Sequence, residues 1–198
     1  TLFTDLVRMG VLAPQALRHL ISIYQAERDW GKAIEHARQF EAASGEPMGY
    51  LLEHQHFYGL DLQVDARVLV PRPDTEPLVD WALELLAARP SAAVVDLGTG
   101  SGAIALALKA TQPHLQVLAV DASADALAVA QANAQRLGLD VDFVLASWLN
   151  GVSGPFDLVV SNPPYIANGD HHLTALTHEP LTALASGPDG LDDIRSLI

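Results

Sequence analysis

The chain has 198 residues, of which 49% are hydrophobic, and it carries 24 acidic against 11 basic side chains and no cysteine. This composition supports a buried core and excludes wholesale disorder, a disulfide framework and a thiolate metal site. Residues 49–198 hold 18 of the acidic and 6 of the basic side chains, a charge balance that repels phosphate backbones and disfavours direct nucleic-acid binding.

The first residues of the chain carry no visible export signal, because residues 1–5 lack a basic stretch followed by an apolar one. No apolar run in the sequence approaches the roughly 18 residues that a membrane span needs. We therefore expect a cytoplasmic protein that makes no membrane contact. The sequence leaves the oligomeric state open.

Residues 1–44 are predicted to form a helical hairpin. Apolar residues recur at helical spacing over 14–29 and again over 30–43, and we expect Trp30 on the buried face of the second helix. The hairpin partly resembles a single tetratricopeptide repeat, although an ordinary helix pair fits the loose pattern as well. Residues 44–47, Ser-Gly-Glu-Pro, break the second helix and mark the expected boundary of this unit.

Residues 45–90 are predicted to hold a linker, a small β-hairpin and a first helix. Short β-type runs alternate with turn residues over 55–70, and the last of these runs is Val68-Leu69-Val70. The segment 71–76, Pro-Arg-Pro-Asp-Thr-Glu, resists regular structure at its second proline, and a helix is expected from its end to about Ala88.

Residues 91–198 show an α/β pattern. Strands are predicted over 93–97, 116–120, 141–146 and 156–161, and helices over 103–110 and 124–137. Strands that alternate with helices of this length form right-handed βαβ units around a parallel sheet. We expect the strand order 3-2-1-4, a Rossmann-like arrangement in which the first and fourth strands bracket a ligand crevice.

A glycine-rich turn follows the first strand of this sheet. It reads Asp-Leu-Gly-Thr-Gly-Ser-Gly over residues 96–102 and opens a helix, so that its backbone can turn tightly and approach a ligand closely. Asp121, at the end of the second strand and 19 residues past Gly102, is placed to accept hydrogen bonds from both hydroxyls of a ribose.

The turn alone leaves two cofactors open. Gly98, Gly100 and Ala103 satisfy the looser dinucleotide pattern of an NAD-dependent oxidoreductase. Two details favour S-adenosylmethionine instead: the Gly-x-Gly-x-Gly spacing that Gly102 completes, and the carboxylate of Asp96, which suits a cationic ligand and repels a pyrophosphate.

The fourth predicted strand ends in Asn162-Pro163-Pro164-Tyr165. The two prolines stop the strand and stiffen the turn, so the side-chain oxygen of Asn162 and the carbonyl of Pro163 become fixed acceptors beside the ring of Tyr165. Such a pair of acceptors fits an NH₂ group, either the amide of a glutamine or the exocyclic amine of a base. The predicted topology places this turn and the glycine loop at one crevice.

Residues 45–198 resemble the HemK/PrmC family, the glutamine N5-methyltransferases that modify peptide chain release factors. The matching segments are Gly45-Glu46-Pro47 with Tyr50-Leu51, Pro71 to Glu76, Asp96 to Gly102, Asp121, Asn162 to Tyr165, and His178-Glu179-Pro180. The resemblance implies methyl transfer from S-adenosylmethionine to the glutamine of a Gly-Gly-Gln motif in a release factor.

The resemblance also implies site residues, which fall into three groups. The catalytic residues would be Asn162, Pro163 and Tyr165. The cofactor contacts would be Asp96, Gly98, Thr99, Gly100, Gly102, Asp121, Trp148 and Asn162. The substrate contacts would be Asn162, Pro163, Pro164, Tyr165, Arg72 and Glu76.

The sequence departs from the family pattern in three places. Ser147 stands where such enzymes often carry an aspartate before the tryptophan, family members continue past the position of Ile198 and add the last strands of the sheet, and residues 1–44 do not clearly match the family's own helical domain. The methyltransferase domain over 91–198 is therefore expected to be incomplete, with the fourth strand at an edge.

Three rival functions remain open at this level: an adenine-N6 methyltransferase on nucleic acid, an NAD-dependent oxidoreductase, and a non-enzymatic repeat adaptor. We expect no metal site. The pairs His54/His56 and His171/His172 come without a spaced set of carboxylates or thiolates, so surface or structural roles are favoured.

Overall fold

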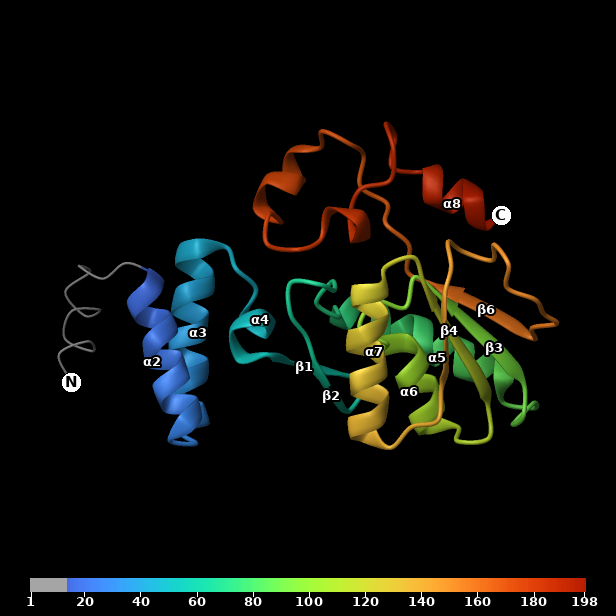
Figure 1. The fold of residues 1–198 in the computed structure, drawn as a ribbon, viewed down its shortest axis with the longest axis horizontal. Helices are drawn as coiled ribbons and strands as arrows, with labels where there is room; N and C mark the ends of the chain where they lie inside the picture. Colours follow the sequence, from blue (N-terminus) through green and yellow to red (C-terminus); the bar gives the residue numbers. More distant parts are fainter. Residues whose placement is uncertain (1–13) are drawn as a thin grey trace.

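The computed structural model describes residues 14–198 (Figure 1). Residues 1–13, which include the segment analysed for an export signal and the start of the predicted 1–44 unit, lie outside the described residues. Two antiparallel helices open the described chain, α2 (Pro14–Ala26) and α3 (Trp30–Ser44), and the short α4 (Met48–Leu52) follows. The predicted hairpin is confirmed as a pair of helices, whereas its standing as a separate domain stays a prediction.

The apolar contact between α2 and α3 buries the expected helix faces except at Trp30. Leu17 and Ile21 of α2 pack against Ala37 and Phe40 of α3, with Leu51 of α4 in the same cluster. The side chain of Trp30 is 52% exposed, so the expectation that it lies in the core was wrong. Trp30 is the first residue of α3, and the buried residues of this helix begin one turn later, at Ala33.

A two-stranded antiparallel hairpin connects the helices to the sheet. It consists of β1 (His54–Phe57) and β2 (Leu60–Gln63). The third predicted run, Val68 to Val70, is not a strand: it passes the hairpin as irregular chain, although all but Leu69 of its side chains are buried. A short 3-10 turn, η1 (Pro73–Thr75), leads into α5 (Glu76–Leu86), so regular structure begins at the proline that was expected to prevent it.

The main sheet has four parallel strands in the order β5-β4-β3-β6, which confirms the predicted order 3-2-1-4. The strands are β3 (Ala93–Leu97), β4 (Gln116–Asp121), β5 (Asp142–Leu145) and β6 (Leu158–Ser161), and the connecting helices are α6 (Ala103–Thr111) and α7 (Ala124–Leu137). Among the described residues β6 pairs only with β3, and its Val159 is 49% exposed.

The two faces of the sheet are covered differently. One face, with Val94, Ala119 and Val160, packs against α5, α6 and α7 in the largest core cluster. On the other face Val95, Leu97 and Val120 pack against residues of the β5–β6 connection and against Leu197. Parallel sheets are stable only when both faces are covered, and here an irregular connection supplies much of the second layer.

The last segment of the chain arches over the carboxyl ends of the strands (Figure 1). It contains the 3-10 turns η2 (His171–Ala175) and η3 (Leu181–Ala183) and the helix α8 (Asp192–Leu197). A parallel bridge between Ile166 and Ala185 closes this segment on itself. Among residues 14–198, no helix is long and apolar enough to cross a membrane.

Candidate active site

The glycine loop between β3 and α6 is held by backbone contacts to the neighbouring strand. The N–H groups of Gly98 and Thr99 both donate to the carbonyl of Val120, at 2.9 and 3.0 Å. Gly98, Gly100 and Gly102 all have positive φ angles, which L side chains rarely adopt. At Gly102 a Cβ would also lie 3.0 Å from Leu106 and 3.2 Å from Ala130, so a larger residue would push α6 away from α7.

Asp96 lies beneath the loop and is fully buried. Its Oδ2 accepts from the hydroxyl of Thr99 at 2.7 Å and from the N–H of Ala105 at 3.2 Å, whereas its buried Oδ1 has no partner among the described residues. Burial raises the pKa of Asp96 to about 6, and the charge of Asp121 acts in the same direction. Asp96 thus presents an unsatisfied carboxylate oxygen under the loop, where a nearby positive charge would stabilise it.

Asp121 ends β4 and orders the loop from the other side. Its Oδ2 accepts from the N–H of Gly100 and its Oδ1 from the N–H of Ser123, both at 2.9 Å. The side chain of Ser123 in turn accepts from the N–H of Ala126 and caps α7. A carboxylate oxygen has more than one acceptor position, so these contacts orient Asp121 and still leave it able to accept from a ligand.

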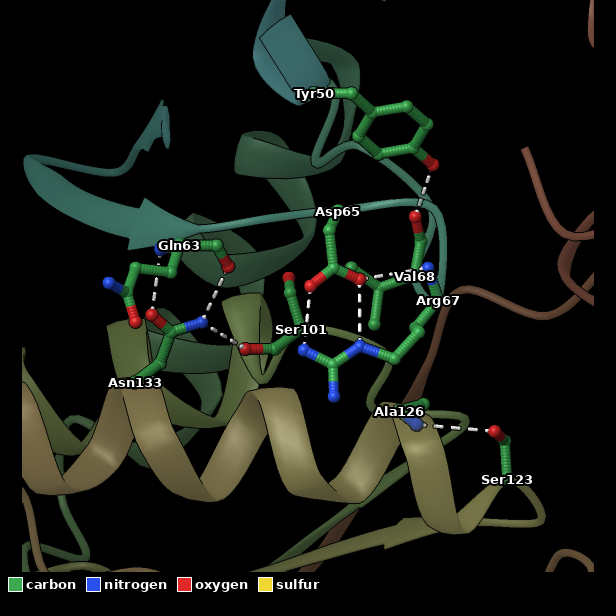
Figure 2. Close-up of polar contacts among 9 residues, drawn as sticks. All are labelled: Tyr50, Gln63, Asp65, Arg67, Val68, Ser101, Ser123, Ala126 and Asn133. Atoms are coloured by element: carbon green, nitrogen blue, oxygen red, sulfur yellow. Dashed lines mark hydrogen bonds and ion pairs between the residues drawn. The ribbon is translucent and has the colours of Figure 1, made fainter. Parts of the chain in front are cut away.

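Asn133 on α7 ties the loop to the β-hairpin (Figure 2). Its buried amide accepts from the N–H of Gln63 at 2.7 Å and donates at 3.0 Å to the carbonyls of Gln63 and Ser101. Buried polar groups are costly unless they are paired, and this one side chain satisfies three backbone groups from two segments. The hairpin therefore contributes to the position of the glycine loop.

A cavity of about 320 Å³ opens over the carboxyl ends of β3, β4 and β6, and we refer to it as the main cavity. Most of the predicted site residues line it: Gly98, Thr99, Gly100, Asp121, Trp148, Arg72, Asn162 and Pro164. The indole of Trp148 lies over Gly98, where a Cβ on the glycine would be 3.5 Å from the ring. The structure thus brings the two predicted motifs to one cavity.

Five predicted site residues are not among the lining residues of this cavity. Asp96 and Gly102 are the two ends of the glycine loop, and Pro163 and Tyr165 lie in the turn after β6, where Tyr165 is 65% exposed. Glu76 instead accepts from the N–H of Tyr58 at 2.8 Å. The cavity lining gives no support to the prediction that Glu76 shapes a substrate entrance.

The side chains at the end of β6 and in the turn after it form two hydrogen bonds among the described residues. The hydroxyl of Ser161 donates to the carbonyl of Leu97 at 2.7 Å, which fixes the strand end beside β3. The amide Nδ2 of Asn162 donates to the hydroxyl of Thr75 at 3.4 Å. With Nδ2 directed to Thr75, the Oδ1 of Asn162 remains available as an acceptor.

Thr75 and Glu179 are residues of this region that sequence reasoning did not assign to the site. Thr75 lines the main cavity and contacts Asn162, which is 87 positions further along the chain. Glu179 is 6% exposed and forms an ion pair with Arg72. Both lie within segments that carried the family resemblance, but their partners are distant in sequence, so only the fold reveals their contacts.

In the part of the chain that the structure describes, one cluster of metal-ligating side chains forms outside the main cavity. Donor atoms of Asp170, His171 and His172 lie within 4.8 Å of one another. One carboxylate thus accompanies His171 and His172, not a spaced set, and the expectation of no metal site stays a prediction. Asp170 accepts from the N–H and the ring Nδ1 of His172, at 2.9 and 2.8 Å, and so caps the short turn η2.

A parallel sheet whose glycine loop and Asn-Pro-Pro-Tyr turn face one cavity defines a methyltransferase domain, and comparison with known proteins agrees. The model of the methyltransferase small domain family matches residues 79–186. The chain belongs to this family.

The curated relatives point to one branch of methyltransferases. A release factor glutamine methyltransferase of Xylella fastidiosa is 49% identical over 161 residues, which cover 79% of this chain and 58% of that protein. Proteins of the same name from Deinococcus radiodurans and Gloeobacter violaceus are 47% and 44% identical and cover 79% and 98% of this chain. The resemblance inferred from the motifs is confirmed. The chain spans 57–66% of the length of these relatives.

Solved structures show the same fold at lower identity. The catalytic domain of hMettl16 in complex with a MAT2A 3'UTR hairpin superposes with a TM-score of 0.57 at 16% identity, covering 84% of this chain and 60% of that one. A second complex of that domain gives 0.55 at 18% identity. At such identities the likeness shows the α/β fold alone.

Proposed function

We propose that the protein transfers a methyl group from S-adenosylmethionine to the side-chain amide nitrogen of a glutamine in a peptide chain release factor. The observation that carries this proposal is the main cavity itself, which joins Gly98, Gly100 and Asp121 on one side to Asn162 on the other. The names of the relatives supply the substrate class. A cytoplasmic location follows from that substrate, because release factors act on ribosomes.

The residues present fit a cationic nucleoside cofactor. The unpartnered Oδ1 of Asp96 lies under the loop, and Asp121 lines the cavity where a ribose would offer its hydroxyls. Trp148 supplies an aromatic face beside Gly98 for an adenine, and the loop residues Thr99 and Gly102 keep the backbone in place. When bound, S-adenosylmethionine supplies a methyl group on a positively charged sulfur, which is already activated for transfer.

The turn after β6 would hold the substrate. A glutamine amide is a weak nucleophile because its lone pair is delocalised, so its two N–H groups need acceptors that favour charge on nitrogen. The Oδ1 of Asn162 and the carbonyl of Pro163 would provide them, Pro164 would keep the turn rigid, and the exposed ring of Tyr165 would cover the planar amide and exclude water. Holding two reactants in line lowers a barrier by about 7–11 kcal/mol, so positioning is the main contribution of the protein.

The two rival enzymatic functions fit the observed site less well. A nucleic-acid substrate would meet a segment with 18 acidic and 6 basic side chains over residues 49–198. The pyrophosphate of NAD would lie against the glycine loop, above the buried carboxylate of Asp96, whose Oδ1 has no partner among the described residues and which would repel it. An adaptor without catalysis would leave the cavity without a role.

Calorimetric titration with S-adenosylmethionine, with NAD as comparator, tests the cofactor, and methylation of a purified release factor followed by mass spectrometry tests the reaction. We expect binding of S-adenosylmethionine alone, weakened about 10- to 100-fold in Asp121→Ala, because hydrogen bonds to a charged group contribute about 1.5–3 kcal/mol. Asp140→Asn, on the exposed loop after α7, is the charge-matched control and should bind like the parent. Binding of NAD, or methylation of an oligonucleotide in preference to the release factor, would refute the proposal.

A further inference from the structure

Glu179 is the most deeply buried carboxylate of the segment that follows β6, with a side chain only 1% exposed. Its Oε1 accepts from the N–H of Val70 at 3.2 Å, and its Oε2 accepts from Nη2 of Arg72 at 2.6 Å. These partners lie 109 and 107 positions earlier in the chain. A buried carboxylate is stable only when it is paired and hydrogen-bonded, and Glu179 meets both conditions through one short segment.

That segment, residues 68–72, forms part of the wall of the main cavity through Val68, Leu69, Pro71 and Arg72. It pairs with no strand among residues 14–198, and two of its backbone groups are met by side chains. The hydroxyl of Tyr50 donates to the carbonyl of Val68 (Figure 2), and Glu179 accepts from the N–H of Val70. Burial, with a smaller contribution from the charge of Glu179, raises the pKa of Tyr50 far above its usual value, so its hydroxyl remains a donor.

Arg72 lies between two cavities. It lines the main cavity and also a second cavity of about 170 Å³, which we refer to as the side cavity. The side cavity is also lined by Glu41, His178 and Glu179. The side chain of Arg72 is 43% exposed, and Glu179 is the only hydrogen-bond partner of its guanidinium among the described residues. A guanidinium has five N–H donors, so most of them remain free for a ligand.

Arg72 is also connected to Asn162. The N–H of Thr75 donates to the carbonyl of Arg72 at 3.0 Å, and the hydroxyl of Thr75 accepts from Asn162. A shift of residues 70–72 would therefore move both the free guanidinium donors and the residue that orients Asn162.

We propose that Glu179 is a positioning residue for the protein substrate: its carboxylate fixes Arg72 at the boundary of the two cavities, and the free donors of Arg72 bind backbone carbonyls of the substrate segment that carries the glutamine. This inference rests on the proposed function and deepens it by assigning a substrate-orienting pair. Among the described residues, the side chain of Glu179 forms its hydrogen bonds with Val70 and Arg72 and none with the glycine loop, so its effect is directed to the protein substrate.

The test compares Glu179→Gln, Arg72→Gln and the double variant in the full chain, with a release factor as substrate. Glutamine retains an oxygen for the N–H of Val70 but removes the charge that holds Arg72. We expect each single variant to raise the KM for the release factor on the order of tenfold, with a smaller change in kcat and unchanged S-adenosylmethionine affinity. Because both residues act as one pair, the double variant should lose little more than either single variant.

The chain offers a matched control in Asp157, whose carboxylate also accepts from an arginine, Arg89, and from a backbone N–H, that of Ala93. Asp157→Asn removes the same kind of pair away from both cavities, and the KM should stay at the parent value. Glu179→Asp, which retains the charge, should recover part of the loss. Fully additive losses in the double variant, or an equal loss of cofactor binding, would overturn the inference.

A second measurement covers variants that fold poorly and separates this inference from the proposed function. Hydrogen exchange of the Val70 amide should quicken in Glu179→Gln, because a neutral amide oxygen accepts more weakly than a carboxylate. Exchange of the Thr75 amide, which donates to the carbonyl of Arg72, should quicken in both Glu179→Gln and Arg72→Gln, so either variant can be used if the other does not fold. A parent chain that binds S-adenosylmethionine but leaves the release factor unmethylated contradicts the proposed function. Even then, exchange at the Val70 and Thr75 amides that is as slow in Glu179→Gln as in the parent would overturn the inference about Glu179, whatever the reaction of the protein.

Discussion

The two sides of the main cavity differ in how their polar groups are satisfied. On the loop side, formed by residues 96–102 with Asp121, the N–H groups of Gly98, Thr99 and Gly100 all have partners within the protein. On the strand-end side, formed by residues 162–165, one contact of 3.4 Å to Thr75 orients Asn162, and the ring of Tyr165 is mostly exposed. The loop side is therefore preorganised, whereas the strand-end side is left for a substrate to complete.

The difference has a physical reason in the proposed reaction. A small cofactor gains affinity from a site that needs no reordering, since ordering side chains on binding costs free energy. A protein substrate brings its own backbone and amide groups and can satisfy acceptors that stay open in the free enzyme. The predictions below test this comparison, beginning with the largest expected effect.

Asn162→Ala is expected to separate the two sides most sharply. Removing one preorganised acceptor at the reacting group should lower kcat for release-factor methylation by about 10²–10³-fold. Although Asn162 is also a predicted cofactor contact, we expect the S-adenosylmethionine Kd to change by less than about fivefold, because the loop side stays intact. Single-turnover methylation and calorimetry measure the two quantities.

The control for Asn162→Ala is Asn150→Ala, in the exposed turn after Trp148, which should leave both quantities unchanged. If Asn162→Ala weakened cofactor binding as much as it slowed the reaction, the division between the two sides would fail. If it left the rate intact, Asn162 would have no catalytic role.

Asp96→Asn tests whether the loop side is built for a positive charge. The folded-state pKa of Asp96 is raised to about 6 from an ordinary 3.8, so the folded protein holds this proton more tightly than the unfolded chain does. Its contribution to stability is present below about pH 4 and is lost as the pH rises through about 6. The variant without ligand should therefore gain stability relative to the parent on going from pH 4.5 to pH 8, by at most about 3 kcal/mol.

Urea unfolding at the two pH values measures this gain for Asp96→Asn. Bound S-adenosylmethionine would compensate the buried negative charge, so at pH 8 the ligand should stabilise the parent more than it stabilises the variant. If the free energy of unfolding differed between variant and parent by the same amount at pH 4.5 and pH 8, the pKa of Asp96 would not be raised in the folded protein.

The parts that sequence could predict are those with local signals. The boundaries of α7 coincide with the prediction because Ser123 caps its start and Gly138 ends it in a left-handed conformation. The strand order and the shared cavity follow from βαβ handedness, which requires no side-chain detail. The place of the glycine loop beside Asp121 at this cavity was predictable for the same reason, whereas the roles of the individual loop residues stay predictions.

The parts that sequence could not predict depend on contacts between distant segments. The run Val68 to Val70 has the composition of a strand, yet Tyr50 and Glu179 satisfy its backbone in place of a neighbouring strand. The short α4 gives too few residues for a periodic signal. No local sequence pattern indicates that Thr75 contacts Asn162, because 87 positions separate the two residues.

Thr75→Val tests the hydrogen bond that orients Asn162 and should have the smallest effect. Valine fills nearly the same volume but cannot accept from Asn162, and one neutral hydrogen bond contributes about 0.5–1.5 kcal/mol, so kcat should fall by about 2- to 12-fold. Cofactor affinity should not change. Thr75→Ser keeps the hydroxyl and should retain a rate close to that of the parent, measured with the same release factor. Equal losses in the two variants would assign the effect to packing of the threonine methyl group, and Asn162 would then owe its orientation to the rigid turn of Pro163 and Pro164 alone.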